Sequence, residues 1–210
     1  MMDQEILDVA QELFAKNGYT GTSTQDIGDR VGLDKTSLYY YFRSKEEILF
    51  QVVVRLRERG DLRMMRIEAL DVPADERLAA AIRAHCHEIR DHRDEAQVYL
   101  IESRHVVGKH RAELTRFHRA YEHRLQQLIL AGQEEGLFDP GLDPLIVTNG
   151  MLAMMNGLFN TRRSVDPEYM DTSTETYVRL ILAGLRPQAP ASSMRPSNSK
   201  RPAKRKPAAV

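Results

Sequence analysis

The sequence predicts an all-α fold, and three observations support that prediction. Apolar residues recur at the spacing of one helical face, first in Ile6, Val9, Ala10, Leu13 and Phe14. Residues that favour helix N-termini stand directly before several such segments. No segment alternates apolar and polar residues in the manner of a half-buried strand.

The first two helices are predicted from residues that typically begin or end a helix. The helix that contains Ile6 and Phe14 is expected to end at Asn17-Gly18, because glycine adopts positive φ without strain. Ser23 or Thr24 is expected to cap a second helix. Gly32 interrupts that helix after only about two turns.

Two further helices complete the N-terminal segment. Asp34 is expected to cap the third helix, in which Leu38 and Phe42, at i and i+4, share the inward face. Ser44 is expected to cap a fourth helix that runs towards Met65. Its first turn places two acidic residues near the positive end of the helix dipole.

The remaining chain also reads as helices separated by turns. Pro73 is expected to follow the end of the fourth helix, and Asp75 to cap the next one. Gly136 is expected to end a helix before a turn at Pro140-Gly141. These signals predict helices over residues 75–91, 94–107, 110–135, 143–162 and 167–185.

Charge is distributed unevenly although Lys+Arg and Asp+Glu both number 30. Seven cations and no acid lie from Arg186 to the end, which leaves 23 cations and 30 acids before it. Residues 187–210 are therefore predicted to be a disordered basic tail beside an acidic folded body. The tail is interpreted either as a linker that aids solubility or as a nonspecific contact to a polyanion.

The composition predicts a cytoplasmic protein with no membrane partner. No stretch reaches the roughly 18 apolar residues of a membrane span, and the start of the chain lacks the features of a signal peptide. Cys86 is the one cysteine, so no disulfide can form within the chain, which agrees with a reducing compartment.

Three adjacent tyrosines in "DKTSLYYYFRSK", residues 34–45, predict contact with DNA. Two short helices joined by a glycine turn form a helix-turn-helix, whose second helix enters the major groove. Since Leu38 and Phe42 hold this helix to its domain, Tyr39 and Tyr40 face outward, where phenol hydroxyls can donate to phosphate oxygens. Tyr41 lies between the two faces and can pack or contact DNA.

"STQDIGDRVGLDKTSLYYYFRSKEEIL", residues 23–49, resembles the DNA-binding signature of the TetR family of bacterial transcriptional regulators. Asp34 replaces the usual serine and Thr36 a frequent glycine. Residues 1–50 hold five cations and nine acids, so affinity must depend on a local basic face. The resemblance implies a homodimer that binds a near-palindromic operator through Thr24, Lys35, Thr36, Ser37, Tyr39, Tyr40, Tyr41 and Lys45.

The regulatory half is weakly similar to TetR members that sense fatty acyl or steroid-derived coenzyme A thioesters. "YEHRLQQLILAGQEEGLFDPGLDP" and "VRLILAGL" carry this similarity. It implies a repressor of lipid or acyl-CoA metabolism genes, released by an acyl-CoA or another lipid metabolite; a multidrug-sensing repressor is the alternative. The expected pocket residues are Tyr99, Arg104, His118, Tyr121, Met151, Met154, Met155 and Phe159.

The helix at 150–162 has two competing interpretations. Its methionines offer an apolar surface that can adapt to a ligand, but the last two helices of this family commonly pair in a four-helix dimer seam. Tyr177, Leu180, Ile181 and Gly184 have the spacing for that seam. The predicted organisation is a DNA-binding domain at 1–47, a connecting helix at 48–70, a ligand-binding and dimerisation domain at 71–186, and the tail at 187–210.

A third function class is an all-helical metal-dependent enzyme or adaptor. His85, Cys86, His87 and His92 lie close in sequence, but their spacing is not the i, i+4 of a helical zinc pair. Glu102 and His105 form one Glu-x-x-His pair, whereas a di-iron bundle needs two. No spacing predicts a catalytic triad. We therefore expect a regulator that is not an enzyme, with no catalytic residue, metal site or cofactor.

Overall fold

The computed structural model describes residues 2–160 and 166–187, and helices account for most of them. The predicted all-α fold is confirmed, since no strand occurs in these ranges. The elements are α1 (Met2–Asn17), α2 (Thr24–Val31), α3 (Lys35–Tyr41), α4 (Lys45–Glu68), α5 (Ala74–Asp91), α6 (Arg93–Leu100), the 3-10 helix η1 (Glu102–His105), α7 (Gly108–Glu134), α8 (Pro144–Gly157), the 3-10 helix η2 (Leu158–Asn160) and α9 (Pro167–Leu185).

Local capping positions the N-terminal helices as predicted. Ser23 caps α2 in a reciprocal capping box with Asp26, and Gly32 ends α2 at φ 73°. Asp34 caps α3 by accepting from the Ser37 backbone N–H, and Ser44 caps α4 by accepting from that of Glu47.

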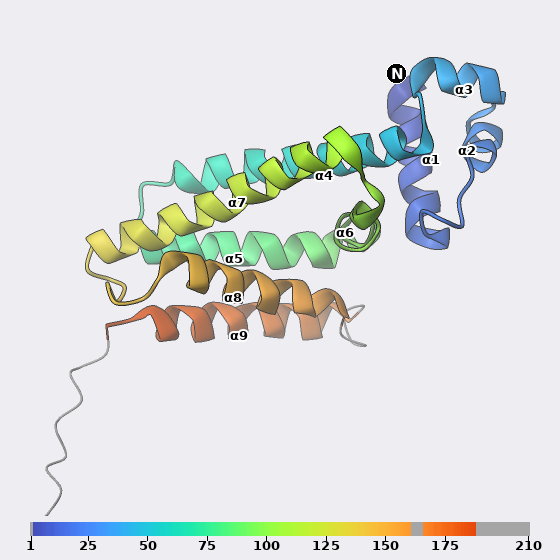
Figure 1. Cartoon of the computed structure of the whole chain (residues 1–210). Coiled ribbons are helices and arrows are strands. Elements are labelled where there is room, and N and C mark those ends of the chain that lie inside the picture. Colours follow the sequence, from blue (N-terminus) through green and yellow to red (C-terminus); the bar gives the residue numbers. More distant parts are fainter. Residues whose placement is uncertain (1, 161–165, 188–210) are drawn as a thin grey trace, which may run out of the picture.

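Two hydrophobic clusters organise the molecule, and α4 runs between them (Figure 1). One cluster joins α1, α2, α3 and the first half of α4, and its buried residues include Phe14, Ile27 and Leu38. The other joins the end of α4 to α5, α7, α8 and α9. Val98 of α6 and Leu114 of α7 belong to the first cluster, so the helix-turn-helix unit packs directly on the regulatory helices.

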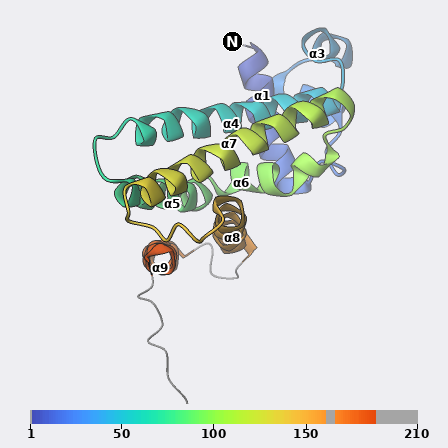
Figure 2. The same cartoon turned by 60° about the vertical axis from the view of Figure 1, so that its left-hand side comes forward.

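Figure 2 shows α8 and α9 side by side, on the side of the regulatory helices away from α4, and α8 also packs against α7. Contacts between α8 and α9, and between α9 and α5, hold this arrangement. None of the described helices combines the length and apolar character that crossing a bilayer requires. The predicted tail lies outside the described residues, apart from Pro187.

Three of the predicted elements are wrong in detail. The helix expected at 94–107 ends at Leu100 and gives way to η1. There the buried carboxylate of Glu102 turns towards the N-terminal unit and accepts from the Tyr19 backbone N–H at 2.9 Å. Asp75 is not a cap, because α5 already begins at Ala74 after Pro73. The helix expected at 143–162 ends at Gly157 and continues as η2; the last residues of that prediction lie outside the described residues.

Gly132 of α7 permits the close approach of the Phe138 ring. A Cβ at this position would lie 2.1 Å from Cδ2 of Phe138, which is 2% exposed. We expect Gly132→Ala to lower the free energy of unfolding by about 1–3 kcal/mol through overpacking, although alanine favours helices more than glycine does. Chemical denaturation measures the change.

Gly60 of α4 supplies the matched control. It also lies inside a helix, but a Cβ there would meet no heavy atom within 4 Å. Gly60→Ala should therefore raise the free energy of unfolding, by up to about 1 kcal/mol. A similar change in both variants would show that helix propensity, rather than the Phe138 contact, dominates.

Candidate functional site

The outer face of α3 presents the residues predicted to contact DNA. Leu38 is fully buried and Phe42 is 7% exposed, so these two side chains fix the rotation of the helix. Tyr40 is 86% exposed, whereas Tyr39 and Tyr41 are about half as exposed. Lys35 and Thr36 are exposed in the first turn, and Ser37 is half-buried.

The aromatic rings of α3 are partly held in place. Tyr40 and Tyr41 meet edge to face, with ring centroids 5.4 Å apart. The Tyr39 hydroxyl lies 3.5 Å from Oγ1 of Thr24, which joins the first residue of α2 to α3. Hydrogen bonds from the Ser37 backbone lower the pKa of Asp34, whose carboxylate stays charged at the start of α3.

Lys45 braces the helix-turn-helix unit from within. Its Nζ donates to the carbonyl oxygens of Tyr19 and Thr22, each at 2.7 Å, and lies 4.2 Å from the centroid of the Tyr19 ring. One N–H of an ammonium with three donors remains beyond these two bonds. Lys45 therefore has a structural role in holding the loop that contains Tyr19 and Thr22. Its contact with phosphate stays a prediction.

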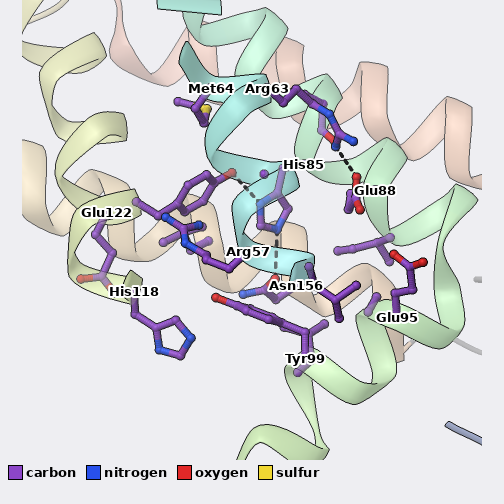
Figure 3. A pocket seen from close by; sticks show the side chains of 18 of the residues that line it. Arg57, Arg63, Met64, His85, Glu88, Glu95, Tyr99, His118, Glu122 and Asn156 are labelled. Atoms are coloured by element: carbon purple, nitrogen blue, oxygen red, sulfur yellow. Dashed lines mark hydrogen bonds and ion pairs between the residues drawn. The ribbon is translucent and has the colours of Figure 1, made fainter. Parts of the chain in front are cut away.

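A cavity of about 390 Å³ opens between α4, α5, α6, α7 and α8 (Figure 3). Its size falls at the lower end of small-molecule pockets. Apolar side chains and polar groups share its wall. The lining residues are Leu56, Arg57, Gly60, Arg63, Met64, Ala84, His85, Glu88, Ile89, Glu95, Ala96, Tyr99, Leu100, Ser103, His118, Tyr121, Glu122, Asn149, Leu152 and Asn156.

His85 is the centre of a hydrogen-bonded group in this wall. Its Nδ1 lies 3.0 Å from the Tyr121 hydroxyl, and its Nε2 lies 3.0 Å from Oδ1 of Asn156 (Figure 3). Burial lowers the pKa of His85, so the ring stays neutral. Burial also raises the pKa of Tyr121 and raises that of Tyr99 to about 12. Both phenols are therefore protonated donors at neutral pH.

Ion pairs close one side of the cavity. Arg63 pairs with Glu88, and Arg59 pairs with Glu95. Arg57 is only 6% exposed; its Nη2 donates to Oδ1 of Asp61 at 2.8 Å. Its guanidinium also lies over the Tyr121 ring, 4.7 Å from the centroid.

The cavity includes three of the eight residues predicted to bind a ligand, namely Tyr99, His118 and Tyr121. Arg104 lies outside it, exposed on η1, where Nε donates to His105 at 3.3 Å. The remaining four also lie outside the lining, and three of them, Met151, Met155 and Phe159, are buried in the core. Met154 is partly buried against the same core.

Arg57 and His85 are the main pocket residues that the sequence did not assign. Arg57 follows Val53 by four residues, on a face of α4 that is otherwise buried and apolar. A charged residue on an apolar helical face is a signal in the sequence that could have indicated a functional role for Arg57. The sequence offers His85 only as a possible metal ligand, and no spacing connects it to Asn156, because α5 and α8 are far apart in the sequence.

A second set of contacts joins the pocket wall to the DNA-binding unit. The Tyr19 ring stacks on His105, with centroids 4.9 Å apart, and its backbone N–H donates to Glu102. His110 of α7 lies 3.0 Å from a carboxylate oxygen of Glu46 and stacks on Phe50 of α4, with centroids 4.2 Å apart. Ser103, next to Glu102, lines the cavity.

The exposed faces of α8 and α9 carry small and apolar residues. On α9, Leu180 is 57% exposed, Gly184 is exposed and Tyr177 is half-buried. Ile146 on α8 is 70% exposed. Ile181, predicted with the seam, is 7% exposed and packs in the core of its own chain.

Metal chemistry receives no geometric support in the part of the chain that the structure describes. There, no group of three or more His, Cys, Asp or Glu side chains is placed to hold a metal ion. His85 bonds to Tyr121 and Asn156, and Cys86 is buried. Glu102 and His105, 3.7 Å apart, belong to the contact with Tyr19.

Family models match both halves of the chain. Residues 6–52 match the model of bacterial regulatory proteins of the tetR family, and residues 71–185 match a tetracyclin repressor-like C-terminal domain. The chain belongs to the TetR family. Helix α3 lies within the residues that match the tetR family model, and the cavity is formed by α4 together with helices of the tetracyclin repressor-like C-terminal domain.

Individual relatives agree with this assignment. The TetR chain is 28% identical over 145 residues to the HTH-type transcriptional repressor KstR2 of Mycobacterium tuberculosis, covering 66% of this chain and 70% of that one. A TetR/AcrR regulator from Thermobifida fusca is 30% identical with a TM-score of 0.70, covering 88% and 98%. FadR from Bacillus subtilis, solved with stearoyl-CoA, shares the fold at 23% identity and a TM-score of 0.73, covering 87% and 99%.

Proposed function

We propose that this TetR protein is a homodimeric repressor that binds a near-palindromic operator and is released by an acyl-CoA or similar lipid effector. One observation carries the proposal. The helix α4 begins beside the recognition helix, at Lys45, and one face of it lines the cavity, through Leu56, Arg57, Gly60, Arg63 and Met64. A ligand in the cavity therefore contacts the same rigid element that supports the DNA-binding unit.

The ligand class is supported by the relatives and by the cavity. FadR was solved with stearoyl-CoA, and KstR2 is named a repressor. The cavity volume of about 390 Å³ lies within the range of small-molecule pockets. This space suits an acyl group, whereas the nucleotide end of a coenzyme A thioester would extend outside. The protein acts in the cytoplasm as a regulator rather than as an enzyme.

The proposed organisation keeps the domains suggested by the sequence. Residues 1–47 bind DNA, 48–70 connect the two halves, 71–186 bind the effector and the second protomer, and 187–210 form the basic tail. The proposed dimer seam is the exposed face of α8 and α9, with Tyr177, Leu180 and Gly184 at its centre. Ile181 supports that face from inside the protomer.

The eight predicted DNA contacts divide into two roles. Thr24, Tyr39, Tyr40, Tyr41 and Lys45 fix the position of α3 on the phosphate backbone. Lys35, Thr36 and Ser37, in the first turn of α3, reach the base edges. Two recognition helices in a dimer would then read half-sites about 34–36 Å apart.

Tyr39→Phe tests this division. Loss of one phosphate hydrogen bond in each protomer should weaken binding about 3- to 10-fold per half-site, on the operator and on unrelated DNA alike. Lys35→Met should instead change the preferred bases. Selection of bound sequences from a random DNA pool, followed by affinity measurements, checks both variants. A changed base preference for Tyr39→Phe, with affinity intact, would reverse the two roles.

Effector release is tested with the wild-type protein on its selected operator. Acyl-CoA thioesters, free fatty acids and planar cationic drugs are compared for thermal stabilisation and for release of the DNA. We expect thioesters to do both, because a ligand shifts an equilibrium only by its difference in affinity for the two states. Release by cationic drugs alone would identify a multidrug sensor. Stabilisation by thioesters without release would remove them as effectors.

A further inference from the structure

Four polar atoms in the cavity wall are buried without a hydrogen-bond partner among the described residues. Two are carboxylate oxygens, of Glu88 and Glu95, and both lie in ion pairs with arginines. The other two are nitrogens, Nε of Arg57 and Nε2 of His118, and neither of these atoms lies in an ion pair among those residues. Only 6% of Arg57 is exposed. Its Nη2 donates to Asp61, but its Nε–H finds no acceptor among the described residues. A buried donor of this kind favours a ligand atom that accepts from it.

The two unpartnered nitrogens, of Arg57 and His118, lie in one part of the cavity. His118 and Tyr121 lie three residues apart on α7, hence on one helical face, and the Arg57 guanidinium rests on the Tyr121 ring. The Tyr99 ring meets His118 edge to face, with centroids 5.4 Å apart. Figure 3 shows Arg57, Tyr99 and His118 directed into the same space.

The nearby carboxylates leave these donors available. Glu88 and Glu95 are already paired with Arg63 and Arg59. Glu122 lines the cavity, and Figure 3 shows its carboxylate directed away from Arg57. Burial, with Arg57 and Arg111 nearby, lowers the pKa of His118. The ring is therefore neutral and can present an N–H at Nε2 in one tautomer.

We propose that the cognate effector carries a carbonyl oxygen on the carbon skeleton inside the cavity, and that this oxygen accepts from Arg57 and His118. A carbonyl oxygen has two lone pairs and can accept from both. An unsubstituted hydrocarbon chain would leave both atoms buried and unpaired. This inference rests on the proposed function, because it assumes that the cavity is the effector site.

Matched coenzyme A thioesters provide the test. Decanoyl-CoA is compared with the keto isomers of oxodecanoyl-CoA, which carry an additional oxygen at different carbons of a chain of the same length. Isothermal titration with the full-length dimer gives each Kd, and operator release is measured in parallel. We expect at least one keto isomer to bind about 10-fold or more tightly than decanoyl-CoA, since a site with unpaired donors discriminates against a ligand that lacks the acceptor.

Two variants locate the discrimination. Arg57→Met keeps much of the side-chain length but has no donor, and His118→Phe keeps the ring but removes Nε2. Each should reduce the preference for the keto isomer to within about 2-fold, while decanoyl-CoA still binds. The ratio is taken within one variant, so a loss of stability does not imitate the result. Arg66→Met, an exposed change on the same helix, should leave the ratio unchanged.

The outcomes separate this inference from the proposed function. If decanoyl-CoA binds and releases the operator as well as every keto isomer, the oxygen requirement is overturned and the proposed function stands. A preference that survives both variants would also overturn the assignment to Arg57 and His118. If no thioester binds while operator binding is intact, the effector class and this inference both fail.

Discussion

Replacing Leu180 with glutamate should convert the TetR dimer to a monomer and weaken operator binding at least about 100-fold. Leu180 is 57% exposed in the protomer, so the substitution does not disturb the core. In the proposed seam it would bury one uncompensated carboxylate from each protomer. An unpaired buried charge costs about 3–5 kcal/mol, which corresponds to two or more orders of magnitude in affinity at about 1.4 kcal/mol each.

Sedimentation and operator titration measure this effect. Leu62→Glu is the matched control, because Leu62 is also 57% exposed but lies on α4. It should leave both the dimer and operator binding unchanged. A Leu180→Glu protein that remains dimeric would place the seam elsewhere on the surface, with Ile146 of α8 no longer part of it.

Glu102→Ala should abolish most of the effector response while leaving the cavity able to bind. Glu102 is 6% exposed and accepts from the backbone N–H of Tyr19, while its neighbour Ser103 lines the cavity. The Tyr19 carbonyl in turn accepts from Lys45 at the start of α4. A short chain of hydrogen bonds therefore links the cavity wall to the DNA-binding unit, and we expect it to transmit movement of that wall.

Allosteric coupling typically changes affinity 5- to 150-fold. We expect Glu102→Ala to reduce the effector-induced change in operator Kd by about 10-fold, with a smaller effect on effector Kd. Glu102→Gln retains an amide oxygen that accepts from Tyr19 and should preserve much of the response. Glu134→Ala, an exposed change at the far end of α7, is the control. An undiminished response in Glu102→Ala would show that coupling does not require the contact between Glu102 and Tyr19.

The sequence by itself determined the N-terminal helices and the outward face of α3. Ser23, Gly32, Asp34 and Ser44 act on the residues next to them, so capping and turn chemistry can be read locally. The inward positions of α3 follow from i, i+4 spacing, which left the tyrosines outside. The methionines of α8, in contrast, could not be assigned to pocket or core from their spacing.

Only the tertiary structure decided which residues meet in the cavity. Apolar residues occur on several sides of α8, so the pattern does not fix its rotation. Packing against α5 and α9 buries Met151 and Met155 and leaves Leu152 and Asn156 towards the cavity. Likewise, Arg57 and His118 lie 61 positions apart in the sequence. No local rule places them together, because their proximity depends on how α4 and α7 pack across the whole domain.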